Sequence, residues 1–375
     1  MSEQLPQQFN QAQETQPDVS LSGAKDLSLT DTPEKTEHQV KLEALSEKLQ
    51  LKVQWESQVK TLNETGVIDI LLDCQDIGVL GVDPHDSTKI KEYPIPTYEE
   101  ILSQITPEQL QILELKESQG FTKLLLTPMV LPLEILISRY KQLIIKKHKE
   151  GKLLSTDGSS LELKEDDNDS TKFDPIFIWD GYLNCDQEDQ DGNTKMTYYP
   201  KDFTDPSFKG FTLNELLTGI TKEKNKQYQA YLNKVKPTNG WSIKLIENLP
   251  DLPAKGQGKT LRHSSGQARK QLEANQSPID YLKKLQEDPQ YANEMGLVIQ
   301  DWLIYAIIHL QQTNQQIDDQ ARACYLIASL VSGGAPVCRW DRYGCQADLS
   351  GDNLGVSGSG YGVRSSVMLP QTIGL

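Results

Sequence analysis

Residues 338–364 read CRWDRYGCQADLSGDNLGVSGSGYGVR. Most of these residues are Gly, Ser, Asp, Asn, Arg, Tyr or Cys, and there is one Trp. Tyr, Trp and Arg supply contact area at a small entropic cost, while Ser, Gly and Asn supply adaptable hydrogen bonds, as in antibody-type binding loops. A polar, Gly-rich tail has a similar composition. A tail needs no apolar flanks, however, and this stretch lies between the apolar runs 324–327 and 362–369. The pattern favours a binding face.

The use of charged residues changes along the chain. The last lysine is Lys284 and the last glutamate is Glu294, although both residue types are common before these positions. An ordinary solvated surface uses Lys and Glu freely. The segment from Met295 onward is therefore either unusually buried, or its residue types are limited by something other than solubility.

Length, charge and cysteine usage limit the class of protein. A chain of 375 residues has room for about two or three domains. The formal net charge of -15 argues against nucleic acid or an anionic membrane as a partner, because either would need a basic surface. We find no secretory signal and no run approaching the roughly 20 apolar residues of a membrane span. The five cysteines lack CxxC spacing, so we expect no disulfide framework and a cytoplasmic location, with export by another route left open.

Composition and periodicity divide the chain into three parts. Residues 1–38 are polar and Pro-containing, and we expect a disordered tail. Residues 39–120 are expected to form a helical region. Apolar residues recur at helical spacing from Val40 to Leu62, and Thr97 and Thr106 are predicted N-caps of two further helices. The first of these helices packs on its own domain or forms a coiled coil, which would join copies of the chain.

Residues 121–375 are expected to form the third part. Its predicted strands are 124–128, 176–179, 197–199 and the half-buried 241–246. Its predicted helices are 131–150, one capped by Thr212, one capped by Ser277, and the very apolar 297–312. Helices gather early and short strands late, without a βαβ repeat. The fold class is therefore α+β, with an irregular antiparallel sheet at the C-terminal end.

Three patterns resemble known chemical sites but fail on spacing. The run 254–260 ends like a phosphate-binding loop, but Pro253 occupies the position of the leading glycine, which favours a surface loop. The five histidines form no metal-binding pair, and His309 is expected to be a hydrogen-bonded core or boundary residue. The acidic runs 166–169 and 186–191 lack the ligand order of a calcium loop. We therefore expect no metal and no cofactor.

From Phe121 onward the chain resembles the C-type-lectin-like variable proteins of diversity-generating retroelements, of the type found in candidate-phyla bacteria, whose fold is that of formylglycine-generating enzymes. The order of several short motifs and the closing GVR carry the resemblance. These motifs are Lys149–Leu154 (KEGKLL), Gly258–Thr260, Lys270–Gln276 (KQLEANQ), Asp301–Leu303, Thr313–Asn314, Ile317–Asp319, Cys324–Leu326 and Gly362–Val367 (GVRSSV).

The resemblance implies a C-type-lectin-like domain over residues 121–375 and a diversified segment over 338–361. In that family, template adenines are copied with errors, so variable positions draw on an alphabet without Lys, Glu, Gln, Met and Trp. Only Trp340 and Gln346 fall outside this alphabet between Cys338 and Arg364. The resemblance thus implies a cause for the missing Lys and Glu. The implied replaceable positions are Cys338, Arg339, Asp341, Arg342, Tyr343, Gly344, Cys345, Asp348, Ser350, Gly351, Asp352, Asn353, Ser357, Gly358, Ser359, Gly360 and Tyr361.

The expected function is recognition of an unknown protein or cell-surface ligand by this face. Exposed loop positions tolerate substitution, whereas buried apolar anchors do not, so a replaceable face needs both kinds interleaved. The expected anchors are Trp340, Ala347, Leu349, Leu354 and Val363. The expected ligand-binding residues are Arg339, Trp340, Asp341, Arg342, Tyr343, Cys345, Asp348, Ser350, Asp352, Asn353, Ser357, Ser359 and Tyr361.

Two other classes of protein stay open. Formylglycine-generating enzymes have a closing strand similar to this one and a pair of reactive thiols shortly before it. Cys338 and Cys345 could play those thiols, with Asp341 or Arg342 adjusting thiolate formation, although their spacing departs from that pattern. The other alternative is a structural protein that forms oligomers through its N-terminal helices.

Overall fold

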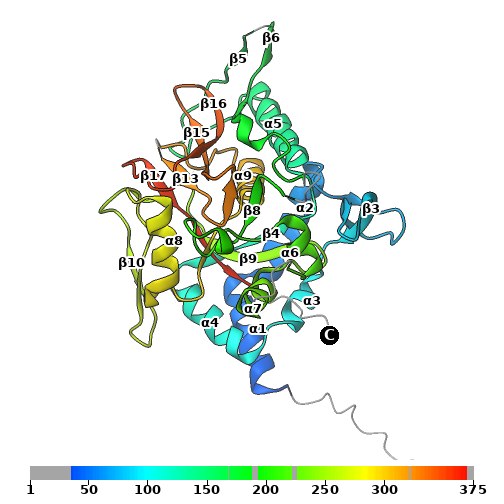
Figure 1. Cartoon of the computed structure of the whole chain (residues 1–375), viewed down its shortest axis with the longest axis vertical. Helices are drawn as coiled ribbons and strands as arrows, with labels where there is room; N and C mark the ends of the chain where they lie inside the picture. The colour runs from blue at the N-terminus through cyan, green and yellow to red at the C-terminus, as the bar shows by residue number, and fades with distance from the viewer. Residues whose placement is uncertain (1–34, 168, 188–192, 222–225, 321, 370–375) are drawn as a thin grey trace, which may run out of the picture.

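The computed structural model describes residues 35–167, 169–187, 193–221, 226–320 and 322–369. Helices and β-sheets both contribute substantially, which confirms the mixed α+β class (Figure 1). The expected tail, residues 1–38, lies outside the described residues up to position 34. Its last residues belong to the first helix, because Thr36 caps α1 (Glu37–Leu49) with a full capping box.

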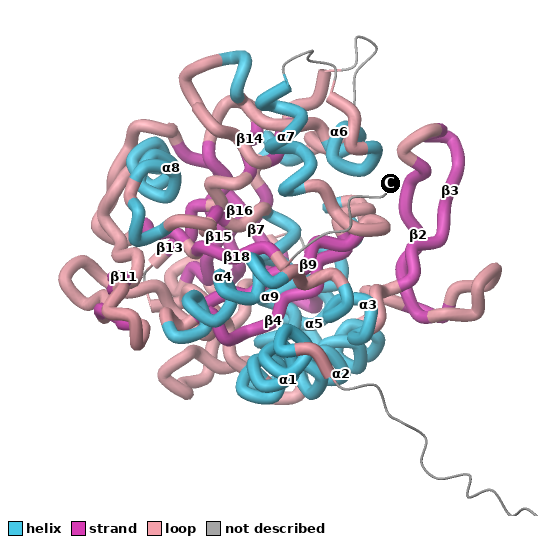
Figure 2. The backbone as a smooth tube through the Cα atoms, turned by 90° about the horizontal axis from the view of Figure 1, so that it is seen from below, coloured by secondary structure: helices cyan, strands magenta, loops and turns pink. Residues whose placement is uncertain are grey.

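The N-terminal region contains more than helices. The helix expected over 40–62 is two helices, α1 and α2 (Leu51–Glu64), because Gln50 between them adopts a left-handed conformation (φ 52°). The helices α3 (Tyr98–Ser103) and α4 (Pro107–Ser118) start at Thr97 and Thr106, as predicted. Between them and α2, residues expected to be helical form the antiparallel strands β1 (Asp69–Ile70), β2 (Ile77–Asp83) and β3 (Asp86–Pro94). β2 and β3 project from the body of the molecule (Figure 2).

A four-stranded sheet occupies the middle of the molecule, in the order β12-β18-β9-β4. Its strands are β4 (Phe121–Pro128), β9 (Trp241–Glu247), β12 (Met295–Gly296) and β18 (Ser365–Met368). All seven residues of β9 are buried, so the expectation of a half-buried strand was wrong. The polar side chain of Lys244 is accommodated in this interior because it pairs with Asp301 and donates to the Tyr199 hydroxyl over 3.1 Å.

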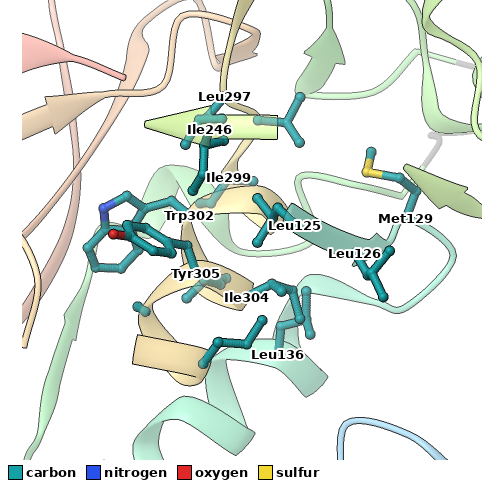
Figure 3. Packing of buried hydrophobic residues seen from close by; sticks show 14 of the residues in the cluster. Leu125, Leu126, Met129, Leu136, Ile246, Leu297, Ile299, Trp302, Ile304 and Tyr305 are labelled. Atoms are coloured by element: carbon teal, nitrogen blue, oxygen red, sulfur yellow. The ribbon is translucent and has the colours of Figure 1, made fainter. Parts of the chain in front are cut away.

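Two long helices cover this sheet. They are α5 (Leu133–Lys149) and α9 (Ile299–Thr313), which pack on each other; α9 also packs on β4. Leu125 and Leu126 of β4, Ile304 of α9 and Leu136 of α5 belong to one hydrophobic cluster (Figure 3). Asp301 fixes the start of α9, since its carboxylate accepts the Val298 amide over 3.0 Å and the Thr127 hydroxyl over 2.8 Å.

The five-stranded sheet holds the C-terminal segment, in the order β17-β13-β15-β16-β7. Its strands are β7 (Ile176–Ile178), β13 (Ala323–Tyr325), β15 (Ala335–Asp341), β16 (Gln346–Asp352) and β17 (Tyr361–Val363). β15 and β16 form an antiparallel hairpin with seven paired positions, flanked by parallel pairing of β16 with β7 and antiparallel pairing of β15 with β13. The C-terminal segment is therefore built into a sheet. This sheet is mixed and not antiparallel as expected, because β13 with β17 and β16 with β7 pair in parallel.

Arg364 links the two sheets, because it lies between the end of β17 and the start of β18. Its guanidinium, 6% exposed, donates twice to Asp318, over 2.6 and 3.1 Å. It also donates to the carbonyls of Leu249 and Pro250, over 2.6 and 3.0 Å. Each bond is charge-assisted, so this one side chain joins three segments distant in sequence.

The remaining helices and strands surround these two sheets. They are β5 (Glu165–Asp166), β6 (Asp169–Phe173), β8 (Met196–Tyr198), α6 (Leu213–Thr218), α7 (Lys226–Val235), β10 (Thr260–Arg262), β11 (Ala268–Lys270), α8 (Pro278–Glu287) and β14 (Ser329–Val331). The main hydrophobic core is one cluster that runs from α1 through β4 and α9 to the C-terminal hairpin. It crosses the boundary expected near residue 120. Lys116 of α4 crosses it too, pairing with the buried Glu294 over 2.6 Å.

Candidate binding face

The β15–β16 hairpin sorts its residues onto two faces, because side chains alternate along a strand. Cys338, Trp340, Ala347 and Leu349 point inward, and each is at most 2% exposed. The residues between them are partly exposed on the other face, which we call the outer face. These residues are Arg339, Asp341, Gln346, Asp348 and Ser350.

Only half of the outer face is covered. A second hydrophobic cluster packs on the side formed by β13 and β17, where Tyr281 and Leu285 of α8 meet Tyr325 and Val363. The other side, formed by β16, β7 and the end of β15 from Arg339 onward, carries outward side chains that are partly exposed. One row of paired positions crosses the three open strands, and it consists of Arg339, Asp348 and Phe177. The open half of the outer face is thus a mostly polar strip.

Arg339 and Asp348 form the central pair of this strip. Their Cα atoms are directly paired across the hairpin, and Arg339 Nε donates to Asp348 Oδ2 over 3.0 Å. A second carboxylate, Asp341, lies 3.9 Å from the same guanidinium. The Arg339 side chain is 32% exposed, so solvent screens the pair and its contribution to stability is small. The Arg339 side chain is accessible to solvent on this strip.

The hairpin tip, residues 342–345, joins the strip to the body of the protein. Tyr343 is 98% exposed, and its amide donates to Asp341 Oδ1 over 3.2 Å, which fixes the turn. Arg342 turns the other way. Its guanidinium donates to the Asp319 carbonyl over 2.9 Å and to the carboxylates of Asp157 and Asp319 over 3.1 and 3.3 Å. Arg342 therefore attaches the tip to the body of the protein, while the Tyr343 side chain extends into solvent.

The loop between β16 and β17 borders the strip at its other end. Asn353, Ser357 and Ser359 are exposed in this loop. The Tyr325 hydroxyl donates to Asp352 Oδ2 over 3.0 Å and holds the loop at its start. Tyr361 closes it, and its ring stacks on Tyr325 with the centroids 5.2 Å apart. Tyr361 is thus partly buried against the second hydrophobic cluster and partly exposed at the edge of the outer face.

The structure brings most of the expected ligand-binding residues together. Those on the outer face are Arg339, Asp341, Asp348, Ser350 and Asp352; those at the tip are Arg342, Tyr343 and Cys345; those in or beside the loop are Asn353, Ser357, Ser359 and Tyr361. Trp340 is different, since it is 2% exposed and points into the core, where it can act as an anchor but cannot touch a ligand. The other expected anchors are buried too, except Leu354, which is half-buried.

Three residues implied to be replaceable are not free to vary. One is Gly358, where a Cβ would come within 2.5 Å of the Tyr361 ring. Cys338 is fully buried on the inner face, opposite Cys324 of β13. Gly351 lies against the indole of Trp179, and a Cβ at this position would come within 2.5 Å of a ring carbon. A side chain at Gly351 would therefore displace Trp179.

Phe177 belongs to the face although the sequence pattern did not indicate it. Its side chain is 47% exposed, and β7 pairs in parallel with β16 so that Phe177 is opposite Asp348. A lone aromatic in a short strand gives no signal of its own. Only the pairing of two segments distant in sequence places Phe177 beside the hairpin.

The two thiols proposed for an oxidase lie in different surroundings. Burial raises the pKa of the Cys338 thiol well above its ordinary value, and the neighbouring Cys324 adds to this effect. Cys345 is at the hairpin tip, with its backbone in the left-handed region (φ 52°). A buried thiol with a raised pKa supplies little thiolate for nucleophilic chemistry.

The other candidate sites also have local explanations. The Gly258 amide, in the loop that resembled a phosphate-binding loop, donates to the Glu273 carboxylate over 2.7 Å. Contrary to expectation, His309 Nε2 has no hydrogen-bond partner among the residues that the structure describes, and burial lowers the pKa of His309 to about 4. Among the described residues no cluster of His, Cys, Asp and Glu has the arrangement of a metal site, and none of their helices is long and apolar enough to cross a membrane.

Comparison with known proteins gave no match: no family model, no curated protein and no solved structure is similar to this chain at a significant level. The geometry of the outer face is therefore the main indication of what this protein does.

Proposed function

We propose that this protein binds a macromolecular ligand through the open half of the outer face, the hairpin tip and the loop 353–360. The residues expected to make contact are Arg339, Asp341, Tyr343, Asp348, Ser350 and the exposed loop residues Asn353, Ser357 and Ser359. Trp340, Ala347 and Leu349 hold the strands from the inner side.

One observation carries the proposal. In the part of the hairpin nearest its tip, residues 338–341 and 346–350, polar outward side chains alternate with inward side chains that are at most 2% exposed. A side chain can then change on one face of the hairpin without a cavity opening on the other. Tyr343, 98% exposed at the tip, has no supporting role in the core and is available for contact.

We further propose that the outer-face residues are one sample of a diversified set, as the resemblance to retroelement variable proteins implies. The absence of Lys and Glu after Glu294 supports this proposal. The genomic DNA beside the gene tests it. We expect a near-copy of the last part of the coding sequence, differing only where the copy has adenine, next to a reverse transcriptase gene. DNA without such a copy would refute diversification and leave ligand binding standing.

A display experiment tests ligand binding. A random peptide library is selected on the immobilised protein, and the enriched peptides are then measured against two variants. Tyr343→Ala combined with Ser350→Arg should abolish capture, since it removes an exposed ring and places a bulky side chain on the strip. A matched control, Val53→Ala with Glu47→Arg on the exposed parts of α1 and α2, should bind as the wild type does.

One outcome of this experiment would contradict the proposed binding site. If the enriched peptides bind the double variant of the face as well as the wild type, the face is not the binding site. Thermal unfolding of each variant shows whether lost capture comes from lost folding. The variant Tyr361→Ala is unsuitable for this test, because Tyr361 stacks on Tyr325 and its loss should also destabilise the fold.

A further inference from the structure

Acidic residues also surround the open half of the outer face in a part of the chain outside the C-terminal segment. The hairpin formed by β5 and β6 lies beside the hairpin tip, at the top of the molecule in Figure 1. Backbone bonds hold the two together: the Lys164 amide donates to the Cys345 carbonyl over 2.9 Å, and the Ala347 amide donates to the Pro175 carbonyl over 2.8 Å. The carboxylates of this neighbouring segment are Glu162, Glu165, Asp166, Asp167, Asp169 and Asp174.

The nearby cations are already paired with carboxylates. Lys164 lies 3.3 Å from Asp167 and 3.5 Å from Asp174, and Lys172 lies 3.0 Å from Asp169. On the face itself, Arg339 is paired with Asp348, and Arg342 is turned toward Asp157 and Asp319. The surroundings of the strip therefore present an excess of negative charge.

Two acceptor atoms on the strip also lack a donor. Asp348 Oδ1 and Gln346 Oε1 are buried atoms with no hydrogen-bond partner within the described part of the chain. Both residues belong to β16 and project from the outer face. A buried acceptor without a donor costs free energy, so a ligand donor that reaches either atom as the side chains of the strip shift would be favoured.

An apolar contact point is next to these acceptors. Phe177, 47% exposed, is paired with Asp348 in the sheet. It comes from β7, outside the segment that resembles a diversified one, so it is a constant part of the face. A ring beside carboxylates suits a guanidinium, which stacks on the ring while it donates to the acids.

We infer that the face takes a basic protein segment, one that presents Arg or Lys beside an apolar side chain. The inference rests on the proposed function and gives the class of partner for the same site. The β5–β6 hairpin and Phe177 supply charge and apolar contact that do not depend on which residues occupy the replaceable positions. An acidic partner would be repelled by the same carboxylates.

The peptides enriched in the display experiment also test this inference. We expect them to carry net positive charge, with Arg more frequent than in the starting library, and to bind more weakly as salt concentration rises. The variant Glu162→Gln, Glu165→Gln, Asp167→Asn neutralises three exposed acids outside the C-terminal segment. It should weaken binding about tenfold, mostly by slowing association. Phe177→Ser should also weaken binding by about tenfold.

A matched control separates local from overall charge. Glu47→Gln, Glu56→Gln, Glu99→Gln removes the same net charge from exposed positions of α1, α2 and α3 and should leave affinity within about twofold. Enriched peptides that are neutral or acidic, yet lose binding with Tyr343→Ala and Ser350→Arg, would overturn the inference and leave the proposed function intact. Equal effects of the two triple variants, or no enriched peptides, would also count against it.

Discussion

Arg364 shows how much of this fold depends on a single side chain. Its guanidinium is bonded to Asp318 and to two carbonyls, and Asp318 also accepts the Trp302 indole N–H over 2.9 Å. Removing the guanidinium leaves a buried carboxylate with one remaining side-chain donor. Buried charges that lose their partner are far more costly than exposed ones.

We expect Arg364→Ala to lower the free energy of unfolding by about 3–5 kcal/mol. The control is Arg339→Ala, which breaks a pair that is 32% exposed on the arginine side and should cost about 1 kcal/mol or less. Urea titrations of both variants measure the difference. Similar losses in the two variants would mean that Arg364 does not join the two sheets as described.

Asp251 gives a prediction about pH. Burial raises the pKa of its carboxyl, and the neighbouring Asp319 and Asp318 raise it further. Thr156 Oγ1 lies 2.5 Å from Asp251 Oδ2 and 2.6 Å from Asp319 Oδ1. The Thr156 hydroxyl has one proton for these two carboxylates, so the folded protein favours the neutral form of Asp251 more than the unfolded chain does.

A carboxyl whose pKa is raised in the folded state stabilises the protein below its unfolded pKa, and this contribution is lost as pH rises through the folded pKa. Asp251→Asn keeps a donor toward Thr156 at every pH. Its stability relative to the wild type should therefore be greater at about pH 7.5 than at about pH 4. Denaturant unfolding at both values measures this change, and an equal difference at the two values would contradict the assignment.

At the scale of elements, the join between α1 and α2 is the clearest case of local strain. Gln50 has φ 52° and ψ 39°, is C-cap of one helix and N-cap of the next, and makes no side-chain cap bond. Glycine adopts this conformation without the penalty of a Cβ atom. We expect Gln50→Gly to raise the free energy of unfolding by about 0.5 kcal/mol.

The matched control for this substitution is Lys60→Gly, at an exposed position inside α2. The same change there should cost about 1 kcal/mol, because glycine weakens a regular helix. A shift of both melting temperatures in the same direction would show that the left-handed join is not a feature of the folded protein.

Signals that span only a few residues were sufficient to predict many elements. The N-caps Thr97, Thr106, Thr212 and Ser277 each begin a helix with the capping box that the sequence indicates. The strands β2 and β3 were missed, and in β2 one reason is that tertiary contacts require its glycines. A Cβ at Gly81 would lie 2.6 Å from Val130, so that residue is small because of packing that no local pattern reveals.

The same distinction holds for the binding face. The alternation of polar and apolar residues in 338–350 could be predicted to place Trp340 and Leu349 on one side of a strand. The contribution of Phe177 could not, since it depends on the register between β7 and β16. Nor could the anchoring role of Arg342, which reaches segments distant in sequence.

At the scale of the whole molecule, the N-terminal helices are part of the same folded unit as the C-terminal sheets. The Gln58 side chain bonds the Leu124 carbonyl over 2.6 Å and the Leu126 amide over 3.1 Å, which attaches α2 to β4. Lys116 and Arg269 both bond Glu294 in the interior. These contacts connect the regions on either side of residue 120.

We therefore expect one cooperative unfolding transition for the whole chain. Urea curves followed by far-UV circular dichroism and by tryptophan fluorescence should coincide. Two separated transitions would show that residues 39–120 fold independently of the rest, as the composition of the sequence alone suggests.

The most direct test of the account compares two libraries built on the same hairpin. One randomises the outward positions Arg339, Asp341, Asp348 and Ser350, and the other randomises the inward positions Cys338, Trp340, Ala347 and Leu349. Resistance of displayed variants to protease measures folding. We predict that most outward variants stay folded, because exposed substitutions usually change stability by about 0.5 kcal/mol or less, and that most inward variants unfold. Outward variants that unfold as often as inward ones would contradict a stable framework with a replaceable surface.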